Sequence, residues 1–474
     1  MTAAISRDVR TRVLILSHDL VGPQMAGPGI RYWELSRVLA RTCAVTLAAP
    51  VAGALPASEG SVHPLTLQSA QEIDPLLANA DVVISNGFLL YQYPQLAEMR
   101  IPWVVDAYIP SPIEGLAYYR ARPLDEQCAM HSANAEILNR FFRCGDFFIC
   151  ANERQRDLYL GILAACGRVN PHTFGQDDTL HELIACVPFV LSPEPPVHRR
   201  AVLKGVQDGV SSTDKVVLWG GGIWDWLDPL TLVRAIARVV AQCPDVRLYF
   251  PGPRHPFQER VPDMAMHQRT VALSDALGLT GKHVFFGDWI PHQERADYLL
   301  EADVGVSLHP AGIEARFAHR TRVLDYIWAG LPMVLTAGDT LAELVQKRGL
   351  GLVVDPGDVE AVAEALLRLL DEPDARAARR ASFQATAAEL TWDVVARPLV
   401  RFCQQPRLAA DKLAGYRPEC MAHDELLRVR GELEEALVRE RELAERVAAY
   451  ERGRLMRLMA SLKRWRTRLG KSRT

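Results

Sequence analysis

The chain has 474 residues with a formal net charge of −3, and 49% of its residues are hydrophobic. This length is about three times the ~150 residues of an ordinary domain, and the composition is typical of a globular protein with a large core. No stretch approaches the ~18 uninterrupted apolar residues that a membrane-spanning helix needs, and no leader-like pattern precedes the first apolar run. We therefore expect a cytoplasmic protein of at least two domains, and we exclude collagen-like, disordered and integral membrane classes.

Positive charge is concentrated at the C-terminal end. Residues 452–474 contain nine Lys and Arg side chains and no acidic one. The rest of the chain is therefore more acidic than the total charge suggests, which disfavours nucleic-acid binding by the main body. The basic end needs an explanation of its own.

The first half of the chain alternates short β-branched runs with helix-like stretches. The runs are 12–18, 44–49, 81–87, 103–108 and 147–152. Between them, 29–40 has a helical pattern, and Asn152 with Gln155 forms the signature of a capping box that opens a helix. Strands separated by helices predict parallel pairing and a doubly wound α/β sheet.

The second half repeats this alternation from residue 215 to residue 357, and Asp228-Pro229 predicts the start of its first helix. Two tandem domains of this class make a cleft between the carboxyl ends of their strands, which is the default ligand site. The predicted domains are 1–195, 196–390, a helix 391–405 that crosses back to the first domain, a linker 406–422, and an amphipathic or coiled-coil helix 423–474 with a basic end.

Each predicted domain has a glycine-rich turn between a strand and a helix. Gly27 and Gly29 follow the first strand, and Gly221 and Gly222 open the second domain beside Trp224. Such turns let a ligand approach the backbone, and free N–H groups at a helix start attract phosphate. A plain strand-to-helix turn and a packed aromatic turn are the alternatives.

The densest group of charged residues lies at 309–332. It contains Glu314, Arg316, His319, Arg320, Arg322 and Asp325. Basic groups beside a helix N-terminus suit a diphosphate, and a carboxylate one turn further can bind ribose hydroxyls. The alternative is a solvated ion pair between Arg322 and Asp325, which share one helical face.

At these residues the chain resembles the family 4 glycosyltransferases. Six elements match in order: the two glycine turns, FPGP at 250–253, 287–310, the DYIWAGLPMVLT block at 325–336, and 349–366. The resemblance covers roughly residues 10–405 and implies the GT-B fold, which consists of two facing Rossmann-like domains. It also implies a nucleotide-diphosphate sugar donor bound mainly to the second domain, an acceptor bound mainly to the first, and no metal or other cofactor.

The resemblance assigns roles to individual residues. Asp325 falls on the second glutamate of the family's paired-glutamate motif, and Phe317 falls on the first, with Glu314 as the nearest substitute. The basic pair that clasps the diphosphate from the second glycine turn is missing here, so Arg316, Arg320 or, preferably, Arg322 would supply the charge.

Asp106, at the end of the fourth strand-like run, occupies a position that faces the acceptor in relatives. A carboxylate there can orient or deprotonate an acceptor hydroxyl, and the alternative is a turn-capping aspartate. Glu114 and His131 are further acceptor-side candidates.

The resemblance thus implies a metal-independent, retaining glycosyltransferase that acts on a saccharide or lipid-linked acceptor in cell-surface polysaccharide or lipopolysaccharide synthesis. A nucleotide-sugar epimerase or sugar-phosphate synthase of the same fold is one alternative. A catalytically degenerate assembly partner is another. Residues 423–451 suit self-association, and 452–474 suit peripheral binding to an anionic membrane on its inner face.

Overall fold

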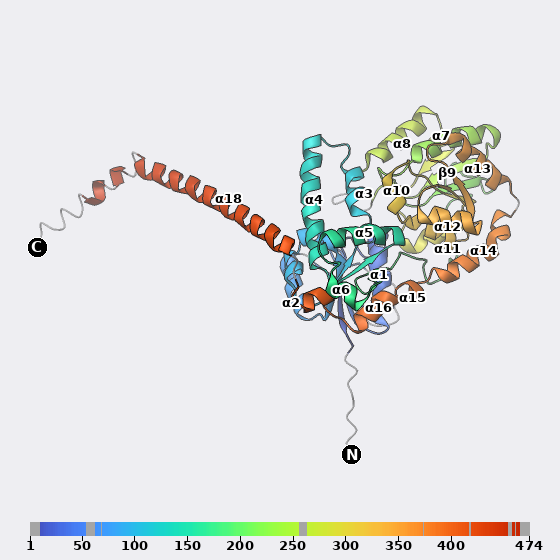
Figure 1. Cartoon of the computed structure of the whole chain (residues 1–474). Coiled ribbons are helices and arrows are strands. Elements are labelled where there is room, and N and C mark those ends of the chain that lie inside the picture. Colours follow the sequence, from blue (N-terminus) through green and yellow to red (C-terminus); the bar gives the residue numbers. More distant parts are fainter. Residues whose placement is uncertain are drawn as a thin grey trace, which may run out of the picture. The chain divides into compact units, whose positions relative to one another are not determined.

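The structure is a computed structural model that describes residues 10–53, 62–67, 69–255, 263–372, 374–416, 419–453, 457–459 and 461–464 (Figure 1). The chain divides into two compact units, Met1–Ala414 and Gly415–Thr474, which we describe separately. The first unit contains both α/β domains, and the second contains the C-terminal helix.

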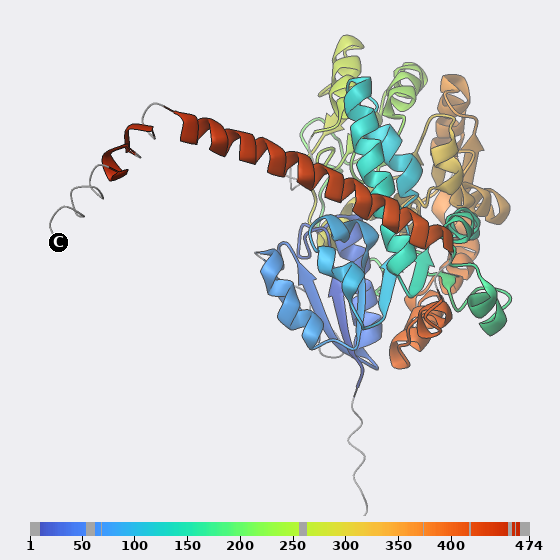
Figure 2. The same ribbon diagram turned by 60° about the vertical axis from the view of Figure 1, so that its left-hand side comes forward.

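The first domain is built on a parallel sheet of seven strands, in which the predicted runs all form strands. The strands are β1 (Arg12–Leu16), β2 (Ala44–Ala49), β3 (Val62–Thr66), β4 (Val82–Asn86), β5 (Trp103–Asp106), β6 (Phe147–Cys150) and β7 (Ile184–Cys186). Their order is β3-β2-β1-β4-β5-β6-β7. Figure 2 shows these strands, coloured blue to green, with helices beside them. The order reverses between β1 and β4, and such a switch point opens a crevice at the carboxyl ends of the strands.

The helices of this domain are amphipathic or capped segments that cover the sheet. They are α1 (Gly27–Ala40), α2 (Ile73–Ala78), α3 (Ser111–Tyr118), α4 (Leu124–Cys144), α5 (Glu153–Ala165) and α6 (Pro171–Gln176), with 3₁₀ turns at Ala70–Glu72, Gly87–Tyr91 and Pro94–Glu98. The Asn152 side chain accepts the Gln155 N–H at 2.9 Å and so caps α5. Gln155 does not close the box on Asn152, because its side chain accepts the N–H of Ala151 instead, at 2.8 Å.

The second domain is a parallel sheet of six strands with the order β10-β9-β8-β11-β12-β13. The strands are β8 (Lys215–Trp219), β9 (Val246–Phe250), β10 (Val284–Phe286), β11 (Val304–Ser307), β12 (Met333–Thr336) and β13 (Gly351–Val354). The helices are α7 (Pro229–Gln242), α8 (Ala265–Ala276), α9 (Arg295–Glu301), α10 (Ile313–Phe317), α11 (Thr321–Trp328), α12 (Thr340–Arg348), α13 (Val359–Asp371) and α14 (Ala375–Glu389), with a 3₁₀ turn at His292–Glu294. Asp228 caps α7 by accepting the Thr231 N–H at 3.0 Å. The switch point here lies between β8 and β11.

The chain then returns to the first domain. Two short helices, α15 (Trp392–Val395) and α16 (Arg397–Gln404), pack against α1. The ring of Phe402 stacks on that of Phe147 in β6, with 4.7 Å between centroids. Buried side chains of both domains consequently belong to one hydrophobic cluster.

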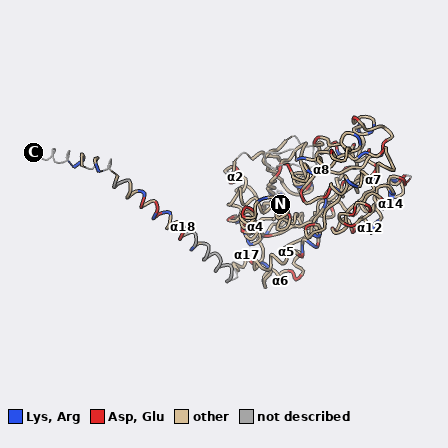
Figure 3. The backbone as a smooth tube through the Cα atoms, turned by 90° about the horizontal axis from the view of Figure 1, so that it is seen from above, with Lys and Arg blue, Asp and Glu red and all other residues tan. Residues whose placement is uncertain are grey.

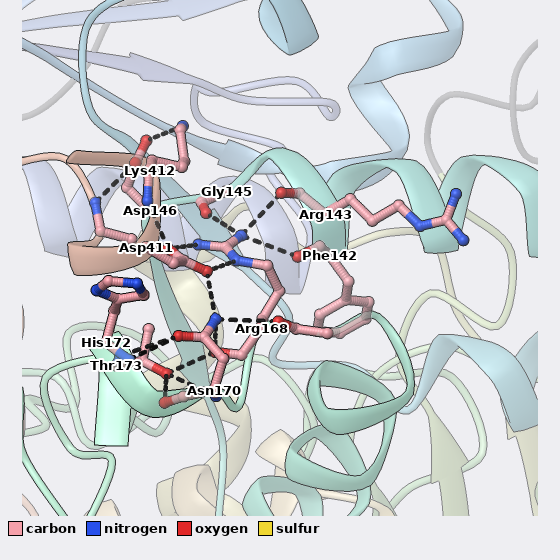
Figure 4. A network of polar contacts seen from close by, with 12 residues as sticks. Phe142, Arg143, Gly145, Asp146, Arg168, Asn170, His172, Thr173, Asp411 and Lys412 are labelled. Atoms are coloured by element: carbon pink, nitrogen blue, oxygen red, sulfur yellow. Dashed lines mark hydrogen bonds and ion pairs between the residues drawn. The ribbon is translucent and has the colours of Figure 1, made fainter. Parts of the chain in front are cut away.

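Residues 406–414 differ from the predicted linker, because they are fixed to the first domain by charged groups (Figure 4). They include the short helix α17 (Ala410–Leu413). Asp411, 3% exposed, binds Arg168 through two contacts of 2.7 and 3.1 Å, and Lys412 binds Asp146 at 2.8 Å. Composition alone does not reveal this anchoring, since the partners are more than 200 residues away in the sequence.

The second unit contains α18 (Glu419–Arg452). Basic and acidic residues both occur along its described part (Figure 3), and Arg430 pairs with Glu434 at 3.3 Å. Val429, Leu433 and Val447 are each at least half exposed. No helix among the described residues is both long and apolar enough to cross a membrane.

Candidate functional site

A cavity of about 200 Å³ lies between the loops that follow β1 and β8, the central strands of the two sheets. Both loops start at the switch points, where the chain order places no helix over the ends of the strands. The first domain contributes Met25, Ala26, Gly27, Ile30 and Glu34, and the second contributes Gly220, Gly221, Gly222, Trp224, Trp289, Ile290, His292, Arg295, Arg322 and Asp325. The cleft expected from the sequence is therefore present and contains six of the predicted donor-side residues.

Arg322 is a basic group of the cavity that forms no ion pair with a carboxylate of the described residues. Its Nη2 donates to the carbonyl oxygen of Gly222 at 3.0 Å, and its guanidinium lies 4.8 Å from the ring centroid of Trp219. Its buried Nη1 has no hydrogen-bond partner among the described residues. Burial lowers the pKa of Arg322 to about 10, so the group stays charged at neutral pH and would be stabilised by an anion. Arg322 is thus poised for an anionic ligand.

Asp325 lies one turn further along α11, on the same wall of the cavity. Arg295 Nε donates to its Oδ1 at 3.2 Å, and 42% of the Asp325 side chain remains exposed. Arg295 is held in place by the ring of Trp328, 4.5 Å from its Cζ, and by Nε2 of His292 at 2.9 Å. Burial and the charge of Arg295 hold the pKa of His292 well below its usual value, so the neutral ring accepts this bond. One carboxylate oxygen of Asp325 is left available for hydroxyl groups.

The glycine loop after β8 forms the floor beside Arg322. Gly221 has φ +85°, a conformation that favours glycine, and a side chain there would meet no atom within 4 Å. The Gly220 N–H donates to the hydroxyl of Tyr326 at 2.7 Å, which fixes the loop to α11. Trp224 lines the cavity and stacks on Trp226 with 5.3 Å between ring centroids. A ligand can therefore approach the backbone at Gly221 beside an aromatic wall.

The loop after β1 supplies the opposite wall through α1. Gly27 faces open space, because a Cβ there would meet nothing within 4 Å. Gly29 does not line the cavity, and a Cβ there would lie 2.2 Å from the carbonyl oxygen of Leu20. Glu34 lines the cavity, and burial raises its pKa to about 7 despite its contact with Arg37 at 3.3 Å. Gly29 thus serves packing within the first domain.

Four residues of the charged group at 309–332 lie outside the cavity lining: Glu314, Arg316, His319 and Arg320. Arg320 and Glu314 neutralise each other at 2.5 Å, while the Arg316 side chain is exposed. Glu114, in α3 of the first domain, faces this pair: burial first, and then the charge of Glu314, raises its pKa to about 7. The structure therefore separates Arg322 and Asp325 from Glu314, Arg316 and Arg320.

The position of Asp106 does not support its expected role facing an acceptor. Its side chain is fully buried and accepts two bonds from Arg31, at 2.7 and 2.9 Å. This pair ties α1 to β5 inside the first domain, so the carboxylate is part of the framework. His131 lies exposed on α4.

The structure adds Arg295, Glu34 and His292 to the cavity, and no motif in the sequence singles them out. Arg295 and His292 reach the cavity through contacts within the second domain, with Asp325 and Trp328, and Glu34 lines it from α1 of the first domain. Among the described residues, no group of three or more His, Cys, Asp and Glu side chains is arranged to hold a metal ion.

Both a protein-family model and solved structures are similar to this chain. Residues 214–372 match the family model described as glycosyl transferases group 1. No curated protein matches the sequence. Solved structures with the same fold include sucrose-phosphate synthase from Thermosynechococcus elongatus, at 18% identity and a TM-score of 0.55, covering 84% of this chain and 99% of that one.

Two further structures are similar. WaaG, a glycosyltransferase involved in lipopolysaccharide biosynthesis, has 15% identity and a TM-score of 0.59 over 83% of this chain and all of that one. HepE from Anabaena, in complex with UDP-glucose, has 15% identity and a TM-score of 0.54 over 82% of this chain and 98% of that one. Residues 214–372 thus match the group 1 glycosyl transferases, and the chain has the GT-B fold of the solved structures with a C-terminal helical extension.

Proposed function

We propose that the protein transfers a sugar from a nucleotide-diphosphate sugar to a hydroxyl of a saccharide or lipid-linked acceptor, with retention of the anomeric configuration. The observation that carries the donor class is Arg322, whose buried Nη1 has no hydrogen-bond partner and whose guanidinium forms no ion pair within the described part of the chain, beside the open glycine loop. In support, HepE was solved with UDP-glucose.

The cavity offers a partner for each part of such a donor. The diphosphate would lie against Arg322 and the backbone N–H groups of the glycine loop, and the ribose hydroxyls would bind Asp325. The base would lie beside Trp289. During transfer the bond between the anomeric carbon and the diphosphate oxygen breaks, a bond to the acceptor oxygen forms on the same face, and the proton of the acceptor hydroxyl passes to the departing diphosphate. Arg322 would stabilise the charge that develops on the departing diphosphate.

On the acceptor side we propose Glu114 in place of Asp106. With its pKa raised to about 7, Glu114 is partly protonated near neutral pH and can accept or donate a hydrogen bond to an acceptor hydroxyl. Glu314, facing it from the second domain, is the remaining catalytic candidate, and Arg320 neutralises its charge. His131 stays a weaker candidate because it is exposed on α4.

The test is a panel of nucleotide sugars, first in thermal-shift assays and then in turnover assays with and without saccharide acceptors. We expect stabilisation by one donor class, acceptor-dependent release of the nucleoside diphosphate, and activity that survives EDTA. Conversion of the donor alone into a second nucleotide sugar would favour an epimerase. Tight donor binding without any turnover would favour a degenerate assembly partner, and no binding to any nucleotide sugar would contradict the proposal.

The C-terminal helix suggests where the enzyme works. We propose that 423–451 supports self-association and that 452–474, most of which lies outside the described residues, binds the inner, anionic face of a cell membrane, where lipid-linked acceptors occur. Supporting observations are the nine basic residues and the exposed Leu458, Met459 and Leu462. Deleting 452–474 should abolish co-sedimentation with anionic liposomes at moderate salt while donor binding stays unchanged. Failure of the intact protein to co-sediment at low salt would contradict the membrane role.

A further inference from the structure

The N-terminal end of α5 reaches from the first domain to the segment 316–319 of the second, which comprises the last residues of α10 and the residues that follow it. Gln155 Nε2 donates to the carbonyl oxygen of residue 317 at 2.8 Å. Asn152 Nδ2 and Arg154 Nη1 donate to the carbonyl oxygens of residues 318 and 316, each at 3.4 Å. Three neighbouring side chains thus hold three consecutive peptide groups of the other domain.

The same turn holds a second segment of that domain. Arg154 also donates to the carbonyl oxygen of Gly338 at 2.9 Å and to Glu343 of α12 at 2.5 Å. Gln155 is fully buried, and its Oε1 is engaged by the N–H of Ala151, so its amide can present only its N–H₂ group to the other domain. The orientation of the contact is therefore fixed by the start of α5 itself.

The segment 316–319 leads directly into Arg320 and α11, whose first turns carry Arg322 and Asp325. A shift of these peptide groups would move the start of α11 relative to the glycine loop, to which Arg322 is bonded. We propose that Asn152, Arg154 and Gln155 are positioning residues, which set the donor-binding end of α11 when the two domains dock. This inference rests on the proposed function only for the identity of the ligand at Arg322.

Gln155→Glu is the sharpest variant, because it keeps the size of the side chain and the acceptor for Ala151. At pH 8 an ionised carboxylate cannot donate to residue 317 and repels its carbonyl oxygen. At pH 5.5 a protonated carboxyl regains a donor. Gln127→Glu is the matched control, since Gln127 also donates its amide to main-chain carbonyls, at residues 120 and 122, but within the first domain.

The measurement is hydrogen–deuterium exchange of the full-length protein over residues 316–323, with each variant compared with wild type at the same pH. We expect Gln155→Glu to exchange about five- to tenfold faster at pH 8, the effect of losing one hydrogen bond, and to approach wild type at pH 5.5. The Gln127→Glu variant should exchange at the wild-type rate over 316–323 at both pH values. Arg154→Ala should also raise exchange over these residues, and because the Arg154 side chain is 25% exposed, this variant can replace Gln155→Glu if that one fails to fold.

Wild-type exchange over 316–323 in both Gln155→Glu and Arg154→Ala at pH 8 would overturn the inference. Faster exchange that persists in Gln155→Glu at pH 5.5 would also overturn it, because the cause would then be general damage. Calorimetry with inorganic pyrophosphate separates the positioning role from the proposed function. Pyrophosphate should bind wild type about five- to tenfold more tightly than it binds the Gln155→Glu variant at pH 8. If wild type bound neither pyrophosphate nor any nucleotide sugar, the proposed function would be wrong. The hydrogen–deuterium exchange over 316–323 would still test the positioning role by itself.

Discussion

Replacing Arg322 with Ala tests the donor site most directly. The change removes the guanidinium at the glycine loop, and with it one contact to the Gly222 carbonyl and one to the ring of Trp219. Because Nη1 has no partner among the described residues, no carboxylate is left unpaired by the change. The lost contact to a diphosphate is charge-assisted and contributes ~1.5–3 kcal/mol, so the donor dissociation constant should rise by about ten- to a hundredfold.

The assay is isothermal titration of the nucleotide sugar that the panel identifies. Arg316→Ala is the matched control, because it removes the same charge from a neighbouring, exposed position outside the cavity lining. Arg322→Lys should give an intermediate affinity, since it keeps the charge but loses the planar contact with Trp219. If Arg322→Ala folded and bound the donor as tightly as Arg316→Ala, the assignment of the cavity to the diphosphate would be refuted.

Three other substitutions test further parts of the structure. Asp325→Asn should weaken donor binding about tenfold, through loss of a charged hydrogen bond to the ribose, without a large change in urea stability. Ionised Glu34 is destabilising because its pKa is raised from 4.5 to about 7, so wild-type stability should fall relative to Glu34→Gln as pH rises from 5 to 8. If the difference in unfolding free energy between wild type and Glu34→Gln, measured by urea unfolding, stayed constant with pH, this prediction would be wrong. Asp106→Asn leaves the buried cation of Arg31 unpaired and should cost ~3–5 kcal/mol of unfolding free energy, and an unchanged midpoint would exclude this framework role.

The fold was largely predictable because its main signals are local. Runs such as 12–18 and 103–108 are β-branched and buried on both faces, which is typical of central parallel strands. The edge strand β3 was not predicted, since Val62–Thr66 contains Pro64 and is mostly exposed, which only an edge position tolerates. Residues 406–414 were misjudged as a linker because the partners that bury Asp411 lie far away in the sequence.

The site was only partly predictable for the same reason. Arg322 and Asp325, which line the cavity, could be singled out from the sequence because they share one short helix with a recognisable pattern. Asp106 was assigned to the acceptor because the sequence shows its place at the end of a strand but not Arg31, which lies 75 positions away and occupies both carboxylate oxygens. Charged residues are therefore easy to find in a sequence, whereas the partner that decides their role depends on the tertiary structure.

The partners of three other buried arginines differ from those of Arg322, and the difference bears on which group a ligand can reach. Arg31, Arg168 and Arg320 each bind a carboxylate, those of Asp106, Asp411 and Glu314. Breaking such a pair to bind a phosphate would leave the carboxylate unpaired, at a cost of several kcal/mol for a buried one. Arg322 instead contacts a carbonyl and an aromatic ring, which hold the guanidinium in place without neutralising it. An anion at the glycine loop would therefore meet a guanidinium that forms no close ion pair among the described residues, and on this ground we propose the second-domain loop as the donor side of the cleft.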